Sequence, residues 1–255
     1  MDKVAELQLI CKEMYAVCEK LCDSLRKKTD IGVSLKIAHA FVLKATRTLK
    51  AVNILFGEGL CEQAQALVRI LFELRLNFDC FLNMASKDHK STCLRIIDAM
   101  LLEKIKQQKA SNFAGLGMIP DSPTIADFEK SEKEIASRYS EDDLKKIRKY
   151  GFTGLPIEQR AILTGHDEAY NIVYRNFSRN IHSTDYVEHY MLQGYFDLEK
   201  MHDYHKSRDI VTLYTALFST GGIAQFANLA FDCGLDAEIK AIGLRQEKLK
   251  NLNVT

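Results

Sequence analysis

Residues 4–25 read VAELQLICKEMYAVCEKLCDSL, and the apolar residues of this stretch recur at alternating steps of three and four. This spacing puts side chains on one stripe of an α-helix, because the helix has about 3.6 residues per turn. The sequence therefore predicts a long amphipathic helix that packs within a bundle or against a second subunit. The stripe consists of Val4, Leu7, Cys11, Met14, Cys18, Leu21 and Leu25.

The rest of the chain shows the same periodicity between a few breaks. Only three prolines occur, Pro120, Pro123 and Pro156, and because proline interrupts a helix they divide the chain into long helix-forming blocks. No run of alternating β-branched residues with hairpin turns occurs, so we expect an all-α multi-helix bundle in a single domain, residues 1–255. The pattern predicts further helices over residues 34–56, 60–85, 91–110, 157–163, 166–181, 210–231 and 236–252.

Two internal segments depart from this pattern. Residues 111–124 collect glycines and prolines, which predicts a flexible loop. Residues 125–149 are dense in charges of both signs and have few large apolar residues, which predicts a charged, solvated helical segment.

Composition restricts the binding partners only weakly. The 35 Lys and Arg nearly equal the 34 Asp and Glu, so any surface for nucleic acid must be local. The seven cysteines form an odd set without a CxxC pair, which is typical of buried thiols in a reducing compartment. The N-terminus lacks the features of a signal peptide, so we expect a cytoplasmic protein.

One segment has the length of a membrane span. Residues 210–231 contain no charged residue and are long enough to cross a bilayer. Threonines, serines, Gln225, Asn228 and a Gly221–Gly222 pair interrupt them, however, and these residues are costly in hydrocarbon. We therefore predict a central helix of the bundle and no membrane association.

The chemically suggestive stretch is residues 170–190, YNIVYRNFSRNIHSTDYVEHY. On a helix Arg175 and His182, seven residues apart, share one face with Arg179, and Asn176 adjoins it. Arginines bind phosphate oxygens and histidine exchanges protons near neutral pH, so this face suits a phosphodiester without a metal ion. The alternative is structural, because such side chains often only pair with carboxylates or carbonyls. Ile172, Val173, Phe177 and Ile181, by contrast, are expected to turn toward a core.

This stretch resembles the signature of the HEPN superfamily of helical bundles, in which a helix carries an Arg, a polar residue and, a few positions later, a His. Arg175, Asn176 and His182 match its long-spaced form. The resemblance implies a HEPN-like core with additional N- and C-terminal helices. It also implies a homodimer that cleaves RNA without metal, with a toxin or phage-defence role and a protein partner such as an antitoxin. In that mechanism His182 would transfer the proton and Arg175 would hold the phosphate.

A second resemblance covers about residues 35–200. The run of residues 57–82, then GLPIEQRA at 154–161 and YRNFSRNIHS at 174–183, is similar to a bacterial family named domain of unknown function 5677. The family's first motif presents an Arg and a Glu four apart, matched by Arg69 and Glu73, and its second ends in a Ser and His, matched by Ser178 and His182. The family usually has a Trp before the second motif, where this chain offers only Phe152.

Arg69 and Glu73 also have a physical interpretation of their own. They share a face of an otherwise apolar helix, so if buried they must pair with each other or with polar groups on a facing helix. The pair either fixes the register of two helices or lets Glu73 orient His182 or Arg175.

Metal and cofactor chemistry find little support in the sequence. Glu199 and His202 have the Glu-x-x-His spacing of di-iron bundles, but no second pair accompanies them. No Cys and His arrangement typical of a nucleophile and no phosphate-binding glycine loop occurs. We predict no metal site and no cofactor. Two other functions stay open: a non-catalytic module that binds RNA, a nucleotide or a protein, and a metal-dependent bundle enzyme.

Overall fold

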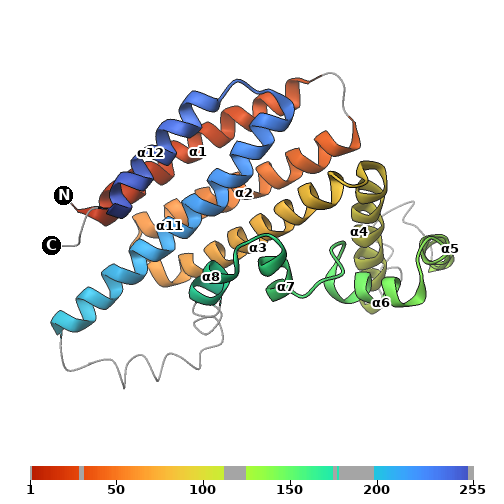
Figure 1. The fold of residues 1–255 in the computed structure, drawn as a ribbon. Coiled ribbons are helices and arrows are strands. Elements are labelled where there is room, and N and C mark those ends of the chain that lie inside the picture. Colours follow the sequence, from red (N-terminus) through yellow and green to blue (C-terminus); the bar gives the residue numbers. More distant parts are fainter. Residues whose placement is uncertain (1, 29–31, 112–124, 175–176, 178–197, 252–255) are drawn as a thin grey trace. The chain divides into compact units, whose positions relative to one another are not determined.

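The computed structural model describes residues 2–28, 32–111, 125–174, 177 and 198–251, and within these ranges every regular element is a helix. The prediction of an all-α bundle is confirmed (Figure 1). The long helices are α1 (Lys3–Lys27), α2 (Val33–Gly57), α3 (Cys61–Ala85), α4 (His89–Ser111), α11 (Leu198–Phe231) and α12 (Asp236–Asn251). The shorter ones are α5 (Ile125–Ala136), α6 (Glu141–Tyr150), α7 (Ile157–Leu163), α8 (Asp167–Ala169) and the π-helix η2 (Tyr170–Tyr174).

Helix α1 follows the predicted stripe closely. The side chain of Asp2 caps its first turn by accepting a 3.1 Å hydrogen bond from the Val4 amide. Every stripe residue after Val4 is buried, and Ile10, Val17 and Cys22 widen the apolar face. Helix α1 packs against α2, α11 and α12 (Figure 1), so its apolar stripe is buried within the helical bundle of this chain.

Helix α11 is the long apolar helix that the sequence predicts. By length and composition alone, His205–Phe231 would pass as a membrane span. Its polar residues Thr212, Ser219 and Thr220 are fully buried in the structure, and the helix packs against α1, α2 and α12. A central helix of a helical bundle has this arrangement.

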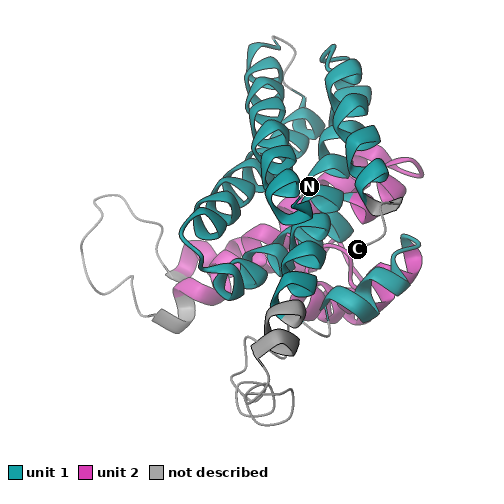
Figure 2. Ribbon diagram, turned by 90° about the vertical axis from the view of Figure 1, so that its left-hand side faces the viewer, with its two compact units in different colours: residues 1–78, 164–255 teal, residues 79–163 magenta. Residues whose placement is uncertain are grey.

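Contacts divide the chain into two compact units, which Figure 2 distinguishes by colour. Unit 1 comprises residues 1–78 and 164–255, and unit 2 comprises residues 79–163. Helix α3 contributes its first part to unit 1 and its last part to unit 2. The prediction of a single domain stays a prediction.

Unit 2 holds the segment predicted as a charged, solvated helical stretch. Residues 125–149 contain α5 and almost all of α6. Three of their apolar residues, Ile135, Leu144 and Ile147, are buried, because they pack with Leu102 of α4 in a small core. The loop predicted over 111–124 lies, apart from Ser111, outside the described residues.

Candidate functional site

A polar stripe runs along one face of α3. Its members Glu62, Gln65, Arg69 and Glu73 follow each other at steps of three and four, which aligns them on the helix. At the first part of the stripe Arg208 of α11 donates to Gln65 Oε1 at 2.7 Å and lies 3.5 Å from Glu62 Oε1. Gln65 is only 1% exposed, so this polar contact is built into the packing of α3 and α11.

At the other end of the stripe, Arg69 connects α3 to η2. Its Nε donates to Glu73 Oε1 at 3.2 Å, which is the predicted pair. Its Nη2 donates to the Tyr174 hydroxyl at 2.6 Å, and the guanidinium carbon lies 4.4 Å from the centre of the same ring. The Arg69 and Glu73 side chains are 22% and 35% exposed, so solvent still reaches both. We call Arg69, Glu73 and Tyr174 the α3 clamp.

The clamp holds the last residue of a π-helix. Tyr174 ends η2, and its ring stacks on that of Tyr170 with centroids 5.0 Å apart and planes inclined by 17°. π-Helical turns are rare, and those that occur are frequently found at functional sites. The residue that follows in the chain is Arg175.

The surroundings of the Tyr174 hydroxyl, burial above all, favour its neutral form. Burial raises its pKa above the usual value, the negative charge of Glu73 adds to the effect, and Arg69 opposes it. The phenol therefore stays protonated at neutral pH and acts as a hydrogen-bonding group in the clamp.

Three of the thiols, those of Cys18, Cys61 and Cys80, are unsuited to nucleophilic chemistry. Burial raises the pKa of Cys18 to about 12 and those of Cys61 and Cys80 to about 11. For Cys61 the charge of Asp209 adds to this, and burial in turn raises the pKa of the Asp209 carboxyl. A reactive cysteine needs a lowered pKa, so these residues are structural.

Of the predicted site residues, the described part of the chain contains Arg69 and Glu73. Arg175, Asn176, Ser178, Arg179 and His182 lie outside it. On the predicted core side Val173 and Phe177 are buried, as expected, whereas Ile172 is 56% exposed and that expectation was wrong. The described residues contain no group of three or more His, Cys, Asp or Glu that would hold a metal ion, and the side chains of Glu199 and His202 lie outside them.

The sequence profile of the family of unknown function DUF5677 matches residues 35–204, or 170 of the 255 residues. The chain belongs to this family. The DUF5677 match includes the α3 clamp and the stretch from Tyr170 through His182, and this bears out the second resemblance. Searches of curated proteins and of solved structures returned no match.

The run GLPIEQRA at 154–161, which lies within the DUF5677 match, has a structural role in unit 2. Arg160 donates to the carbonyl oxygens of Leu155 at 2.8 Å and Tyr150 at 2.9 Å, so it closes the turn between α6 and α7. Gly154 has a φ of 66°, a conformation that side chains other than glycine rarely adopt. The motif therefore fixes a loop.

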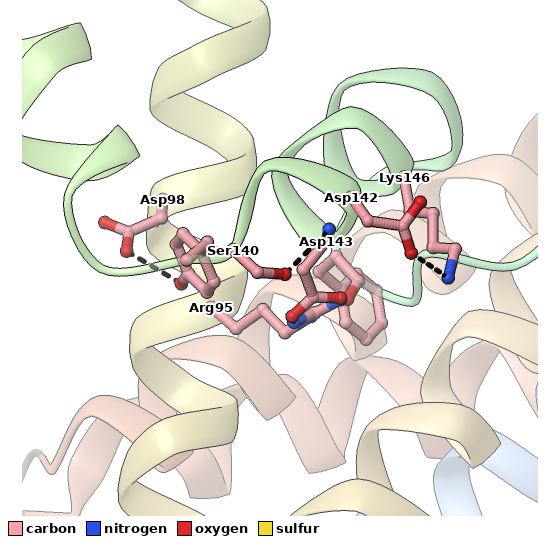
Figure 3. Close-up of polar contacts among 8 residues, drawn as sticks. Arg95, Asp98, Ser140, Asp142, Asp143 and Lys146 are labelled. Carbon is pink, nitrogen blue, oxygen red and sulfur yellow. Dashed lines mark hydrogen bonds and ion pairs between the residues drawn. The ribbon is translucent and has the colours of Figure 1, made fainter.

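Arg95 of α4 stabilises the same loop. Figure 3 shows Arg95 and the polar residues around it. Its Nε donates to the Phe152 carbonyl at 2.6 Å, and its two terminal nitrogens donate to Asp143 at 2.9 and 3.1 Å. Asp98, fully buried, accepts from the Tyr139 hydroxyl at 2.9 Å and from Arg138 at 2.6 Å. Phe152 thus contributes a backbone carbonyl to this contact.

Three polar residues of this region were missed in the sequence: Gln65, Tyr174 and Arg208. The spacing from Glu62 through Glu73 in an apolar helix signals Gln65, because polar residues at helical repeats need partners. No local signal marks Tyr174 or Arg208, which lie 105 and 143 residues from their partners Arg69 and Gln65.

Proposed function

We propose that this DUF5677 protein is a HEPN-like, metal-independent endoribonuclease of the toxin or phage-defence type, with Arg175 and His182 as catalytic residues. The supporting observation is the α3 clamp, which ties Tyr174, the residue before Arg175, to two charged side chains of a packed helix. Catalytic side chains must be held in a fixed position relative to the reacting atoms, and a contact between the neighbouring residue and a packed helix provides this support.

The proposed chemistry uses the neighbouring ribose hydroxyl as nucleophile. The 2′ oxygen attacks phosphorus, the bond to the 5′ oxygen breaks, and the products are a 2′,3′-cyclic phosphate and a 5′ hydroxyl. His182 transfers a proton from the attacking oxygen or to the leaving oxygen, and Arg175 balances the charge that builds on the phosphate. The proposed reaction requires no oxidant, metal or cofactor.

The remaining predicted residues have supporting roles. Asn176, Ser178 and Arg179 contribute hydrogen bonds and charge to the bound RNA strand. Arg69 and Glu73 act as positioning residues through Tyr174. The proposal includes a cytoplasmic homodimer in which two such helices face each other, restrained by a protein partner such as an antitoxin.

The test is cleavage of single-stranded RNA by purified full-length protein in the presence of a chelator. We expect His182→Ala and Arg175→Ala each to lower the rate by about 100-fold or more, because each removes a group that acts in the transition state. The products of the wild-type protein should carry a cyclic phosphate end.

Matched controls are His89→Ala and Arg26→Ala, which make the same chemical changes at exposed positions of α4 and α1. They should cleave as the wild type does. Cleavage retained in both motif variants contradicts the proposal. RNA binding without any cleavage by the wild type favours the non-catalytic module, and stoichiometric iron or manganese with chelator-sensitive activity favours the metal enzyme.

A further inference from the structure

Helix α4 of unit 2 has a row of large apolar side chains on its surface. Leu94, Ile97 and Leu101 are 43%, 37% and 42% exposed. They follow each other at steps of three and four, so they lie on one face of the helix. Single exposed apolar residues are common on protein surfaces, but a contiguous row indicates an interaction site. We call Leu94, Ile97 and Leu101 the α4 seam.

The contacts that hold α4 within unit 2 do not use the seam. Leu102 packs in the small core with apolar residues of α5 and α6. Arg95 binds the Phe152 carbonyl and the Asp143 carboxylate, and Asp98 accepts hydrogen bonds from two residues that follow α5. The exposed apolar residues of α4 therefore need an explanation other than the packing described for this unit.

The width of the seam indicates a single helix as its occupant. At about 100° per residue, Leu94, Ile97 and Leu101 fall within about 60° of one another around the helix axis. A narrow seam is typical of helices that pair as in a coiled coil, whereas a helix that lies on a membrane presents a broader apolar face. Met100, which is 68% exposed, borders the seam and offers a flexible apolar contact beside it.

Lysines stand at both ends of the seam. Lys90 lies four residues before Leu94, Lys104 lies three residues after Leu101, and both are exposed. Among the residues that the structure describes, neither lysine forms an ion pair. The row therefore begins and ends with a positive charge and has three apolar side chains between them.

This charge pattern distinguishes a second copy of the chain from a different partner. If two copies paired antiparallel with Ile97 against Ile97, Lys90 of one copy would meet Lys104 of the other. If they paired parallel in register, each lysine would meet its equivalent. Like charges oppose each other in both arrangements, so a helix with acidic residues at both ends fits the seam better than a second copy does.

We propose that the α4 seam is a docking surface for an amphipathic helix of a partner protein. That helix has three apolar residues at its centre and a Glu or Asp about one turn beyond each end. A nucleic acid would use the lysines but leave the apolar side chains in water. The inference goes beyond the proposed function, because docking at the seam requires neither RNA nor cleavage.

The probes for the test are two fluorescein-labelled peptides of about 20 residues. Both carry Leu at the three central positions that face the seam. The acidic peptide has Glu at the positions that meet Lys90 and Lys104, and the basic peptide has Lys there. Fluorescence anisotropy measures their binding to the full-length protein. We expect the acidic peptide to bind about tenfold more tightly, and we expect this difference to shrink at high salt.

Two double variants separate the apolar contribution from the charged one. Ile97→Ser with Leu101→Ser should weaken binding of the acidic peptide about tenfold, because it removes two of the three apolar contacts. Lys90→Glu with Lys104→Glu should reverse the preference, so that the basic peptide binds more tightly.

Matched controls are Ile54→Ser on α2 and Lys12→Glu on α1, which make the same kinds of change at exposed positions. They should bind both peptides as the wild type does. Circular dichroism with thermal melting checks folding. Because all the substituted side chains are at least partly exposed, we expect the helical spectrum to be unchanged.

Equal affinities for the two peptides, no binding of either, or binding that survives the serine substitutions overturns the docking surface. A dimer or an attachment to phosphatidylserine vesicles that is lost with Ile97→Ser and Leu101→Ser would assign the seam to a second copy or to a membrane instead. Tighter peptide binding after Phe113→Ser with Leu116→Ser would assign it to residues 112–124 of this chain. RNA cleavage alone judges the proposed function, so the two proposals fail independently.

Discussion

Asp143 and Asp142 are neighbouring aspartates in unit 2 with different surroundings (Figure 3). Asp143 accepts two hydrogen bonds from Arg95, and these bonds hold its pKa below the usual value. Asp142 pairs with Lys146 one turn along the same helix at 2.6 Å, but its side chain is 75% exposed. The distances alone therefore do not show which ion pair stabilises the protein more. The lower exposure of Asp143 and its two hydrogen bonds to Arg95 favour the Asp143–Arg95 pair.

Asp143→Asn should lower the free energy of unfolding by roughly 1 kcal/mol at pH 7, a figure kept small because the Asp143 side chain is 42% exposed. A lowered folded pKa means that the stabilisation is present above the unfolded pKa and is lost as the pH falls through the folded pKa. The difference between wild type and variant, measured by urea unfolding, should therefore shrink below about pH 4.

Asp142→Asn is the control and should change stability by a few tenths of a kcal/mol at most. A pH-independent effect of Asp143→Asn, or an equal effect of both variants, would show that the Arg95 contact is not the cause.

At the scale of the element, the glycine pair in α11 lets two neighbouring side chains approach the helix. Arg75 Nη1 occupies the space of a Cβ at Gly222 and donates to the Phe218 carbonyl at 3.4 Å. The Gly221 position faces only the flexible end of Met14. Equivalent substitutions at the two positions therefore have different costs.

Gly222→Ala should destabilise the protein by roughly 1–3 kcal/mol, because it displaces the buried Arg75 guanidinium. Gly221→Ala, which adds the same methyl group against Met14, should cost less than about 1 kcal/mol or be neutral, since alanine also improves the helix. Thermal unfolding of both variants measures the difference, and equal midpoints would refute the role given to Arg75.

The helices themselves were largely predictable from the sequence. The stripe of α1, the ends of α2 and α3 and the central position of α11 follow from apolar periodicity and from the glycines and prolines between them. The π-helix at Tyr170–Tyr174 and the burial of Leu144 and Ile147 in a second core did not follow. Both depend on contacts with residues distant in the sequence, which local patterns do not encode.

The candidate site, too, was predictable from the sequence only in part. The spacing of Arg69 and Glu73 predicted their pairing, because residues four apart meet on a helix. Tyr174 was not predicted, because its contact with Arg69 is set by how the chain returns to α3 after unit 2.

At the scale of the whole molecule, the proposed function includes a homodimer in which the Arg and His motifs of two chains face each other. We expect the protein to have twice the chain mass of 29.0 kDa in solution, measured by sedimentation at the concentrations used for cleavage. Cleavage should fall with dilution as the dimer dissociates. Full activity from a species of 29.0 kDa would rule out the composite site and leave a one-chain mechanism.

The buried thiols give each unit its own reporter of opening. Cys18 in unit 1 and Cys80 in unit 2 are 1% and 0% exposed, so a thiol reagent reaches them only when the surrounding helices part. The rate of labelling at each cysteine then measures how often that unit opens. Mass spectrometry of peptides from the two positions would tell whether the units open together or one after the other, without any change to the sequence.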